Sequence, residues 1–172
     1  FAGGESTAAT ARSVDFDGSG DYLSPISSSD FTFGTGDFTI ECWVKPDDIN
    51  DKGVWQISST GLSSSEQECM VWSNSNDWKF RVDGTTYDHG VKPAIGQWTH
   101  IAWVKHNNKS RLYVNGIASE NNVTDTHNYT GNTLAIGGYY STSYLTNGFI
   151  SNFRLVKGTA VYTSSFRPPT EP

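Results

Sequence analysis

Residues 148–169 read Gly-Phe-Ile-Ser-Asn-Phe-Arg-Leu-Val-Lys-Gly-Thr-Ala-Val-Tyr-Thr-Ser-Ser-Phe-Arg-Pro-Pro. The stretch begins with the apolar pattern of a β-strand, which stops at Gly158, and large apolar residues return at Tyr162 and Phe166. A chain end is usually polar and frayed unless the rest of the fold holds it. The pattern therefore predicts a central strand followed by a tail that docks on the domain.

The expected neighbour of this strand is the segment 38–45, Phe-Thr-Ile-Glu-Cys-Trp-Val-Lys, the cleanest strand pattern in the chain. Apolar and mixed positions alternate with a period of two, as they do along a strand with one buried face. Glu41 and Trp43 fall on the face away from the core, and the core-facing set is Phe38, Ile40, Cys42 and Val44. In the C-terminal strand the alternation breaks, which predicts a β-bulge near residues 151–152.

The rest of the chain also consists of short apolar runs separated by polar turns. The sequence has 172 residues, 17 of them Gly, and aromatic residues make up 13%. No window holds apolar residues at helical spacing, so a long amphipathic helix is not expected. The signals predict one all-β domain over residues 13–172, an antiparallel β-sandwich of roughly 11 or 12 short strands in two sheets. Residues 1–12 are small and polar and are interpreted as an N-terminal arm or linker.

Charge and composition exclude several classes of partner. The formal net charge is −6 and the sequence has no Lys/Arg cluster, so a nucleic-acid partner is not expected. No apolar run approaches the length of a membrane span, so membrane insertion is not expected either. The two cysteines, Cys42 and Cys69, are too few for a disulfide framework. They are interpreted as small buried apolar residues, with a disulfide between them as the alternative.

An acidic turn near the start of the domain raises the question of calcium. Asp15, Asp17 and Asp21 surround a Gly-rich turn, and carboxylate oxygens are the ligands that Ca²⁺ prefers. The spacing does not match the twelve-residue calcium loop of helix–loop–helix proteins. A plain turn is therefore the first interpretation, no cofactor is expected, and calcium at these residues stays the alternative.

The order of the strand signals resembles the laminin-G-like branch of the concanavalin-A-like lectin and glucanase jelly rolls. Each motif is weak alone, but together they cover about residues 13–169 in the right order. The matching motifs are Phe-Asp-Gly at 16–18, the strand 38–46, Gly-Gln-Trp-Thr-His-Ile-Ala at 96–102, Leu-Tyr-Val-Asn-Gly at 112–116, Leu-Ala-Ile-Gly-Gly at 134–138, and Gly-Phe-Ile-Ser-Asn-Phe-Arg-Leu at 148–155. The resemblance implies the jelly-roll fold.

The ending 154–169 looks like a variant common in structural proteins of tailed phages. This resemblance implies a place on a virion surface, tail fibre or capsid exterior, or more generally an extracellular one. The fold alone does not fix function, because the same sandwich serves lectins, glycosidases and scaffolds. The glycosidases of this superfamily carry Glu-x-Asp-x-x-Glu, which is absent here; Glu41 stands alone on its strand, and His100 is expected to be a hydrogen-bonded core histidine. An enzyme is therefore not expected.

Two places combine aromatic rings with hydrogen-bonding groups, which is the mixture that sugar recognition uses. The first is the loop with Tyr139, Tyr140 and Tyr144, and the second is the turn with Asn76 and Trp78. The alternative for each is a loop whose aromatic rings fold back onto the sandwich.

Two hypotheses about function follow. The first is a non-catalytic carbohydrate-binding or adhesion module whose partner is a glycan or a host-surface polysaccharide. The second is a structural or decoration domain that binds other virion or assembly subunits and no glycan. Tyrosine-rich loops serve both purposes, because tyrosine also anchors protein–protein interfaces. Under either hypothesis the domain is expected to be part of a homo- or hetero-oligomer.

Overall fold

The computed structural model describes residues 13–24, 27–64 and 68–170, so the N-terminal arm expected at 1–12 lies outside the described residues. The elements of the described part are β1 (Val14–Asp17), a single 3₁₀ turn η1 (Ser29–Phe31), β2 (Phe38–Pro46), β3 (Lys52–Ser58), β4 (Cys69–Ser73), β5 (Trp78–Val82), β6 (Thr85–Asp88), β7 (Thr99–His106), β8 (Lys109–Val114), β9 (Ile117–Ala118), β10 (Val123–Thr124), β11 (Thr133–Ile136), β12 (Gly138–Tyr139), β13 (Ser141–Leu145) and β14 (Asn147–Lys157). The fold is all-β, as predicted. In these ranges no helix is long and apolar enough to cross a membrane.

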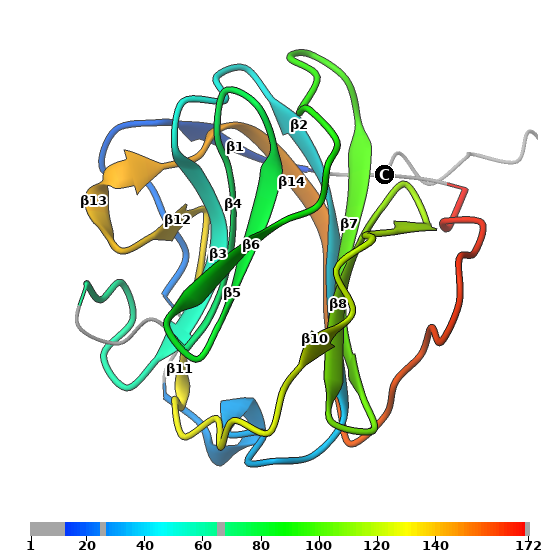
Figure 1. Cartoon of the computed structure of the whole chain (residues 1–172). Helices are drawn as coiled ribbons and strands as arrows, with labels where there is room; N and C mark the ends of the chain where they lie inside the picture. Colours follow the sequence, from blue (N-terminus) through cyan, green and yellow to red (C-terminus); the bar gives the residue numbers. More distant parts are fainter. Residues whose placement is uncertain (1–12, 25–26, 65–67, 171–172) are drawn as a thin grey trace, which may run out of the picture.

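Two antiparallel sheets face each other across the core (Figure 1). The larger sheet has seven strands in the order β1-β14-β2-β7-β8-β10, with β9 added to β8. The smaller sheet has five strands in the order β11-β3-β4-β5-β6. A separate hairpin, β12-β13, lies beside the smaller sheet. This is the predicted sandwich, and the strands beyond the expected number are two-residue segments such as β9 and β10.

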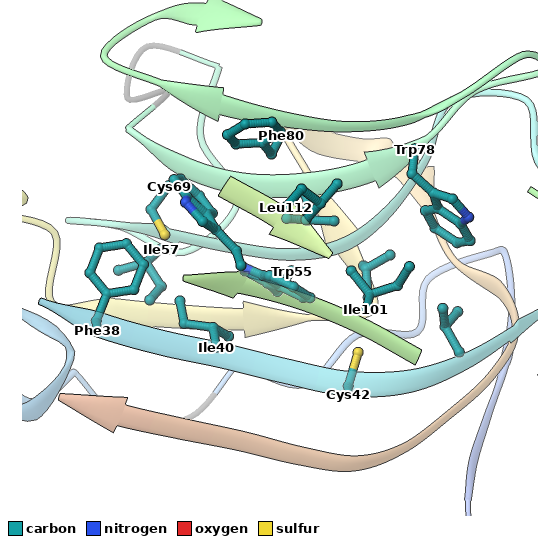
Figure 2. Close-up of a cluster of buried hydrophobic side chains, with 14 of the residues drawn as sticks. Phe38, Ile40, Cys42, Trp55, Ile57, Cys69, Trp78, Phe80, Ile101 and Leu112 are labelled. Carbon is teal, nitrogen blue, oxygen red and sulfur yellow. The ribbon is translucent and has the colours of Figure 1, made fainter. Parts of the chain in front are cut away.

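The core lies between the two sheets and is rich in aromatic side chains (Figure 2). The expected inward set of β2 is buried there: Phe38, Ile40, Cys42 and Val44 are each at most 2% exposed. Trp55 and Trp103 meet them from the smaller and the larger sheet, both with no exposed surface. Burial of this many large apolar side chains is the main favourable term in the folding free energy.

The two cysteines belong to opposite layers of this core. Cys42 lies on β2 of the larger sheet and Cys69 on β4 of the smaller sheet, and both thiols are free. The interpretation as small buried residues is therefore confirmed, and the alternative disulfide is not formed. Burial raises the pKa of both thiols, so they stay protonated and inert at neutral pH.

The C-terminal strand lies where the sequence predicted it. β14 pairs with β1 on one side and with β2 on the other, so it is an interior strand. Its register with β2 shifts between Ser151 and Arg154, which is the expected bulge, and Asn152 adopts a left-handed φ of 50° there. The bulge keeps Ile150 and Phe153 in contact with the core despite the broken alternation.

Residues 159–170, called the C-terminal tail below, dock on the outer face of the larger sheet. Tyr162 and Phe166 stack on each other with ring centroids 3.5 Å apart, and they pack over Ala102, Val104 and Tyr113. The backbone N–H of Phe166 donates to the carbonyl oxygen of Gly116 at 2.9 Å. The predicted docked tail is thereby confirmed (Figure 1, red).

Between the turn after β1 and η1, Leu23 makes an isolated antiparallel bridge to Ile136, and residues 22–24 form no longer strand.

Candidate functional site

The segment 138–145, called the tyrosine hairpin, folds against the outer face of the smaller sheet. Gly53 on β3 makes this approach possible, because a Cβ there would lie 2.3 Å from the backbone nitrogen of Tyr139. Thr146 fixes the end of the hairpin by donating its hydroxyl to the carbonyl oxygen of Gly53. The hairpin therefore sits closer to the sheet than any residue with a side chain at position 53 would allow.

Gln56 ties the hairpin to the sheet through its side chain. It is fully buried, its Oε1 accepts from the N–H of Tyr140 at 2.7 Å, and its Nε2 donates to the carbonyl oxygen of Ser63 at 2.8 Å. Tyr140 has a φ of 64°, which is unusual for an aromatic residue. Strained backbone of this kind clusters at ligand sites, where the surroundings hold it in place.

The aromatic rings of the hairpin form a floor and a rim. Tyr139 is 8% exposed and stacks on Trp72 of β4 at 5.0 Å between centroids, with the planes 13° apart. Tyr140 and Tyr144 are half-buried and stand at 6.2 and 5.2 Å from Tyr139. Three of the residues proposed from the sequence thus meet in one cluster, to which the structure adds Trp72.

An open cavity of about 370 Å³ adjoins these rings, called the tyrosine cavity below. Its lining joins the four aromatic rings to polar and charged side chains; the full set is Asp51, Trp72, Asn74, Lys79, Arg81, Thr86, Tyr139, Tyr140 and Tyr144. The rings of the loop fold back onto the sandwich, which is the second alternative, and in doing so they wall a cavity.

The charged groups at the cavity are held by neighbours on the sheet. Lys79 forms an ion pair with Asp88, and the Nε of Arg81 donates to the carbonyl oxygen of Gly84 at 2.9 Å. Burial raises the pKa of Tyr139, and the nearby carboxylate of Asp51 raises it further, so the phenol stays neutral and keeps its O–H as a donor. The cavity thus offers donors and acceptors beside apolar ring faces.

The second sequence candidate is not brought into this site. Trp78 is 1% exposed and belongs to the core, so its ring folds back onto the sandwich, as the stated alternative has it, and presents no face to a ligand (Figure 2). Asn76 is exposed in the turn before β5, where its N–H donates to the Oδ1 of Asn74 at 3.1 Å. Asn74, and not Asn76, reaches the lining of the cavity.

The alternative calcium site does not assemble. Within the described ranges no three His, Cys, Asp or Glu side chains gather closely enough to hold a metal ion, and this includes Asp15, Asp17 and Asp21. Asp17 instead accepts the N–H of Ser19 at 2.7 Å and stabilises the turn.

A sequence profile of the laminin G type, described as the concanavalin A-like lectin/glucanases superfamily, matches residues 17–160. The chain belongs to this superfamily. A search of curated proteins gives no significant match. The fold that the sequence motifs predicted is therefore confirmed.

Solved structures with the same fold share little sequence with the chain. The heptameric SAP-like pentraxin of Limulus polyphemus has a TM-score of 0.58 at 16% identity, over 87% of this chain and 71% of that one. Domain 4 of the extracellular arabinanase AbnA of Geobacillus stearothermophilus, in complex with arabinotriose, has a TM-score of 0.55 at 17% identity, over 77% and 65%. The CBM40 module of the Ruminococcus gnavus IT-sialidase, bound to α2,3 sialyllactose, has a TM-score of 0.60 at 14% identity, over 76% of this chain and 80% of that one.

Besides Asn74, five residues of the cavity lining were missed from the sequence: Asp51, Trp72, Lys79, Arg81 and Thr86. The signal for the two basic residues is the alternation Trp-Lys-Phe-Arg-Val in β5, which places Lys79 and Arg81 on the face opposite the core. Trp72 pairs with Lys79 across the sheet and therefore shares that outer face. No such signal exists within β4, which is apolar from Cys69 to Trp72.

Proposed function

We propose that this domain is a non-catalytic carbohydrate-binding module and that glycans bind in the tyrosine cavity. The observation that carries the proposal is the cavity's composition, an aromatic floor and rim beside charged and amide groups. Aromatic rings pack on the apolar face of a sugar, while its hydroxyl groups exchange hydrogen bonds with polar side chains. The arabinanase domain and the sialidase module, which share the fold, were solved with bound oligosaccharides, and this supports the same class of ligand.

The lining of the cavity argues against glycoside hydrolysis there. A retaining or inverting glycosidase uses a pair of carboxyl groups on either side of the scissile bond. The tyrosine cavity has one acidic residue in its lining, Asp51. Binding without turnover is the activity that this set of side chains supports best.

The setting in which the module acts is the finer part of the proposal. We place it outside the cell or on a virion surface or tail fibre, where it would attach to a host-surface polysaccharide. The support is the resemblance of residues 154–169 to the ending found in tailed-phage structural proteins. Neighbouring subunits of an oligomer are the expected protein partners.

The test is a glycan array that compares the wild-type domain with the double variant Tyr140→Ala/Tyr144→Ala. These rings form the rim, so we expect the variant to lose at least tenfold in affinity for the glycans that the wild type binds, which corresponds to about 1.4 kcal/mol. Tyr139 stays in place on Trp72, so the variant should keep its fold, which circular dichroism and thermal melting check.

Tyr22→Ala is the matched control, because Tyr22 is 38% exposed and lies outside the cavity lining. We expect it to bind like the wild type. Equal binding by the double variant would overturn the proposal. If assembly with partner subunits were lost instead while glycan binding stayed unchanged, the structural or decoration role would replace it.

A further inference from the structure

A second hollow, of about 260 Å³, lies on the outer face of the larger sheet, on the opposite side of the sandwich from the tyrosine cavity. Its lining comes from β2, β7, β14 and the C-terminal tail and consists of Glu41, Trp43, His100, Asn152, Arg154 and Pro169. Glu41 is the one acidic residue of β2, as the sequence shows, and strand pairing sets Arg154 of β14 directly beside it.

The side chains of this hollow, called the Glu41 hollow, form a charged network. Arg154 makes an ion pair with the Oε1 of Glu41, and the Nε2 of His100 lies 3.5 Å from the Oε2 of Glu41. Burial raises the pKa of Glu41, but the neighbouring polar side chains of His100 and Tyr162 and the charge of Arg154 outweigh it and leave that pKa below its usual value. Glu41 is therefore an ionised carboxylate that only accepts hydrogen bonds.

Three polar atoms of this network are buried without a hydrogen-bond partner: Oε2 of Glu41, Nε1 of Trp43 and Nδ1 of His100. The side chains of Glu41 and His100 are only 5% and 1% exposed. Each unsatisfied buried group costs about 1–3 kcal/mol, and native proteins keep few of them. Three such atoms around one hollow indicate a place that is completed by a bound molecule.

The chemistry of two of these atoms selects the kind of molecule. The Oε2 of Glu41 needs a donor, whereas the indole N–H of Trp43 needs an acceptor. The carboxylate of Glu41 would repel an anion, and the guanidinium of Arg154 would repel a cation. Neighbouring hydroxyl groups satisfy both needs without charge, and the half-exposed ring of Trp43 adds an apolar face.

We propose that the Glu41 hollow is a second ligand site, which takes a single neutral sugar ring. Its volume lies below the roughly 300–1,000 Å³ of pockets for drug-sized ligands, which suits one ring better than an oligosaccharide. Together with the tyrosine cavity it would make the module bivalent, with one site on each outer face of the sandwich. The site uses none of the residues of the tyrosine cavity.

The test follows the indole N–H of Trp43 by ¹H–¹⁵N NMR, with Trp43→Phe used to assign its resonance. The domain is titrated with glucose, galactose, mannose, xylose and arabinose, and with sodium acetate and ammonium chloride as charged comparisons. We expect a saturable shift with at least one neutral sugar and none with the salts. In Trp43→Phe, read on the backbone amide of Arg154, we expect affinity for that sugar to fall about tenfold, since one donor is lost.

The double variant Tyr140→Ala/Tyr144→Ala separates this site from the tyrosine cavity, and we expect it to keep the Trp43 shift. Loss of the shift in that variant would assign it to the tyrosine cavity and overturn the second site. Linear, non-saturating shifts with every sugar in the wild type would mean that the hollow holds only water. A saturable response to acetate or ammonium alone would also overturn the proposal. Each of these results can also be read on the backbone amide of Arg154, should Trp43→Phe fail to fold.

Discussion

Gly53 decides where the tyrosine hairpin lies. A Cβ at this position would meet three backbone atoms: the nitrogen of Tyr139 at 2.3 Å, and the carbonyl carbon and Cα of Gly138 at 2.4 and 2.8 Å. Backbone atoms cannot rotate away as the end of a side chain can, so the contact is relieved only if the hairpin moves. The close approach, and not an unusual φ, is what requires glycine here.

Gly53→Ala should therefore displace the hairpin from β3 and open the rim of the tyrosine cavity. We expect a loss of about 1–3 kcal/mol in the free energy of unfolding, the usual effect of overpacking. We also expect at least a tenfold loss in glycan affinity, because Tyr140 and Tyr144 move with the hairpin. Urea denaturation and titration with an array-selected glycan measure the two effects.

Gly36→Ala is the matched control for this prediction. An added Cβ at Gly36 would lie 3.3 Å from the carbonyl oxygen of Phe33, which is tight but can be accommodated by a small shift, and the residue is not part of the cavity lining. Its affinity for glycan should equal that of the wild type. Unchanged affinity in Gly53→Ala would mean that the hairpin does not position the binding rings.

At the scale of elements, the C-terminal tail acts as a strap across the larger sheet. Phe166 stacks on Tyr162 and contacts Tyr113 and His100 at centroid distances of 5.5 and 5.8 Å. Thr39 of β2 holds the start of the tail: its hydroxyl donates to the carbonyl oxygen of Thr159 and accepts the N–H of Val161. The strap covers Ala102 and Val104, which face outward on β7.

Phe166→Ala should loosen this strap. The ring is half-buried, so we expect the free energy of unfolding to fall by about 1.5–2.5 kcal/mol, roughly half of the loss when a fully buried Phe is replaced by Ala. Val161→Ala, on the same tail but 37% exposed, should change it by about 0.5 kcal/mol or less. Urea denaturation compares the two. Equal, small effects would show that the tail is not docked in solution.

The sequence predicted those features of each element that depend on the residue pattern within a single strand. The alternation in 38–45 predicted the buried face of β2, and its interruption after Ile150 predicted the bulge in β14, because both depend on the period of a single strand. The inward and outward faces of β4 and β5 could not be predicted in this way. β4 is apolar from Cys69 to Trp72, so the pattern does not say which of these residues point inward. For Trp78 the sequence left two alternatives open, and the ring lies in the core.

Other parts of the site depend on strand pairing between distant segments. Glu41 acquires Arg154 across β2 and β14, at a separation of 113 residues along the chain. Gln56 reaches the backbone of Tyr140 over 84 residues. Neither contact leaves a trace in the local sequence, since each follows from the register of the folded sheets. The tyrosines could be named from the sequence, whereas their partners could not.

At the scale of the whole molecule, a buried ion pair ties β7 of the larger sheet to the segment that crosses to the smaller sheet. The Nζ of Lys105, on β7, lies 3.4 Å from the Oδ1 of Asp125, and both side chains are fully buried. Asp125 begins the segment that leads from β10 of the larger sheet to β11 of the smaller one (Figure 1). It also accepts hydrogen bonds from Ser110 and Tyr129, and the Nζ of Lys105 donates to the carbonyl oxygen of His127 at 3.1 Å.

This network predicts strong coupling between Lys105 and Asp125. Loss of one partner leaves a buried charge uncompensated, so Lys105→Met and Asp125→Asn should each lower the free energy of unfolding by about 3–5 kcal/mol. The double variant removes both charges and should lose clearly less than the sum of the two, with a coupling energy of at least about 1 kcal/mol. Urea denaturation of the wild type, the two single variants and the double variant measures this double-mutant cycle.

The half-exposed pair Lys52–Asp48, with its nitrogen and oxygen 3.4 Å apart, provides the comparison. The same cycle at that pair should give a coupling energy of about 1 kcal/mol or less. Additive effects at Lys105 and Asp125 would mean that the segment crossing between the sheets is held by apolar packing around Tyr129 and not by charge.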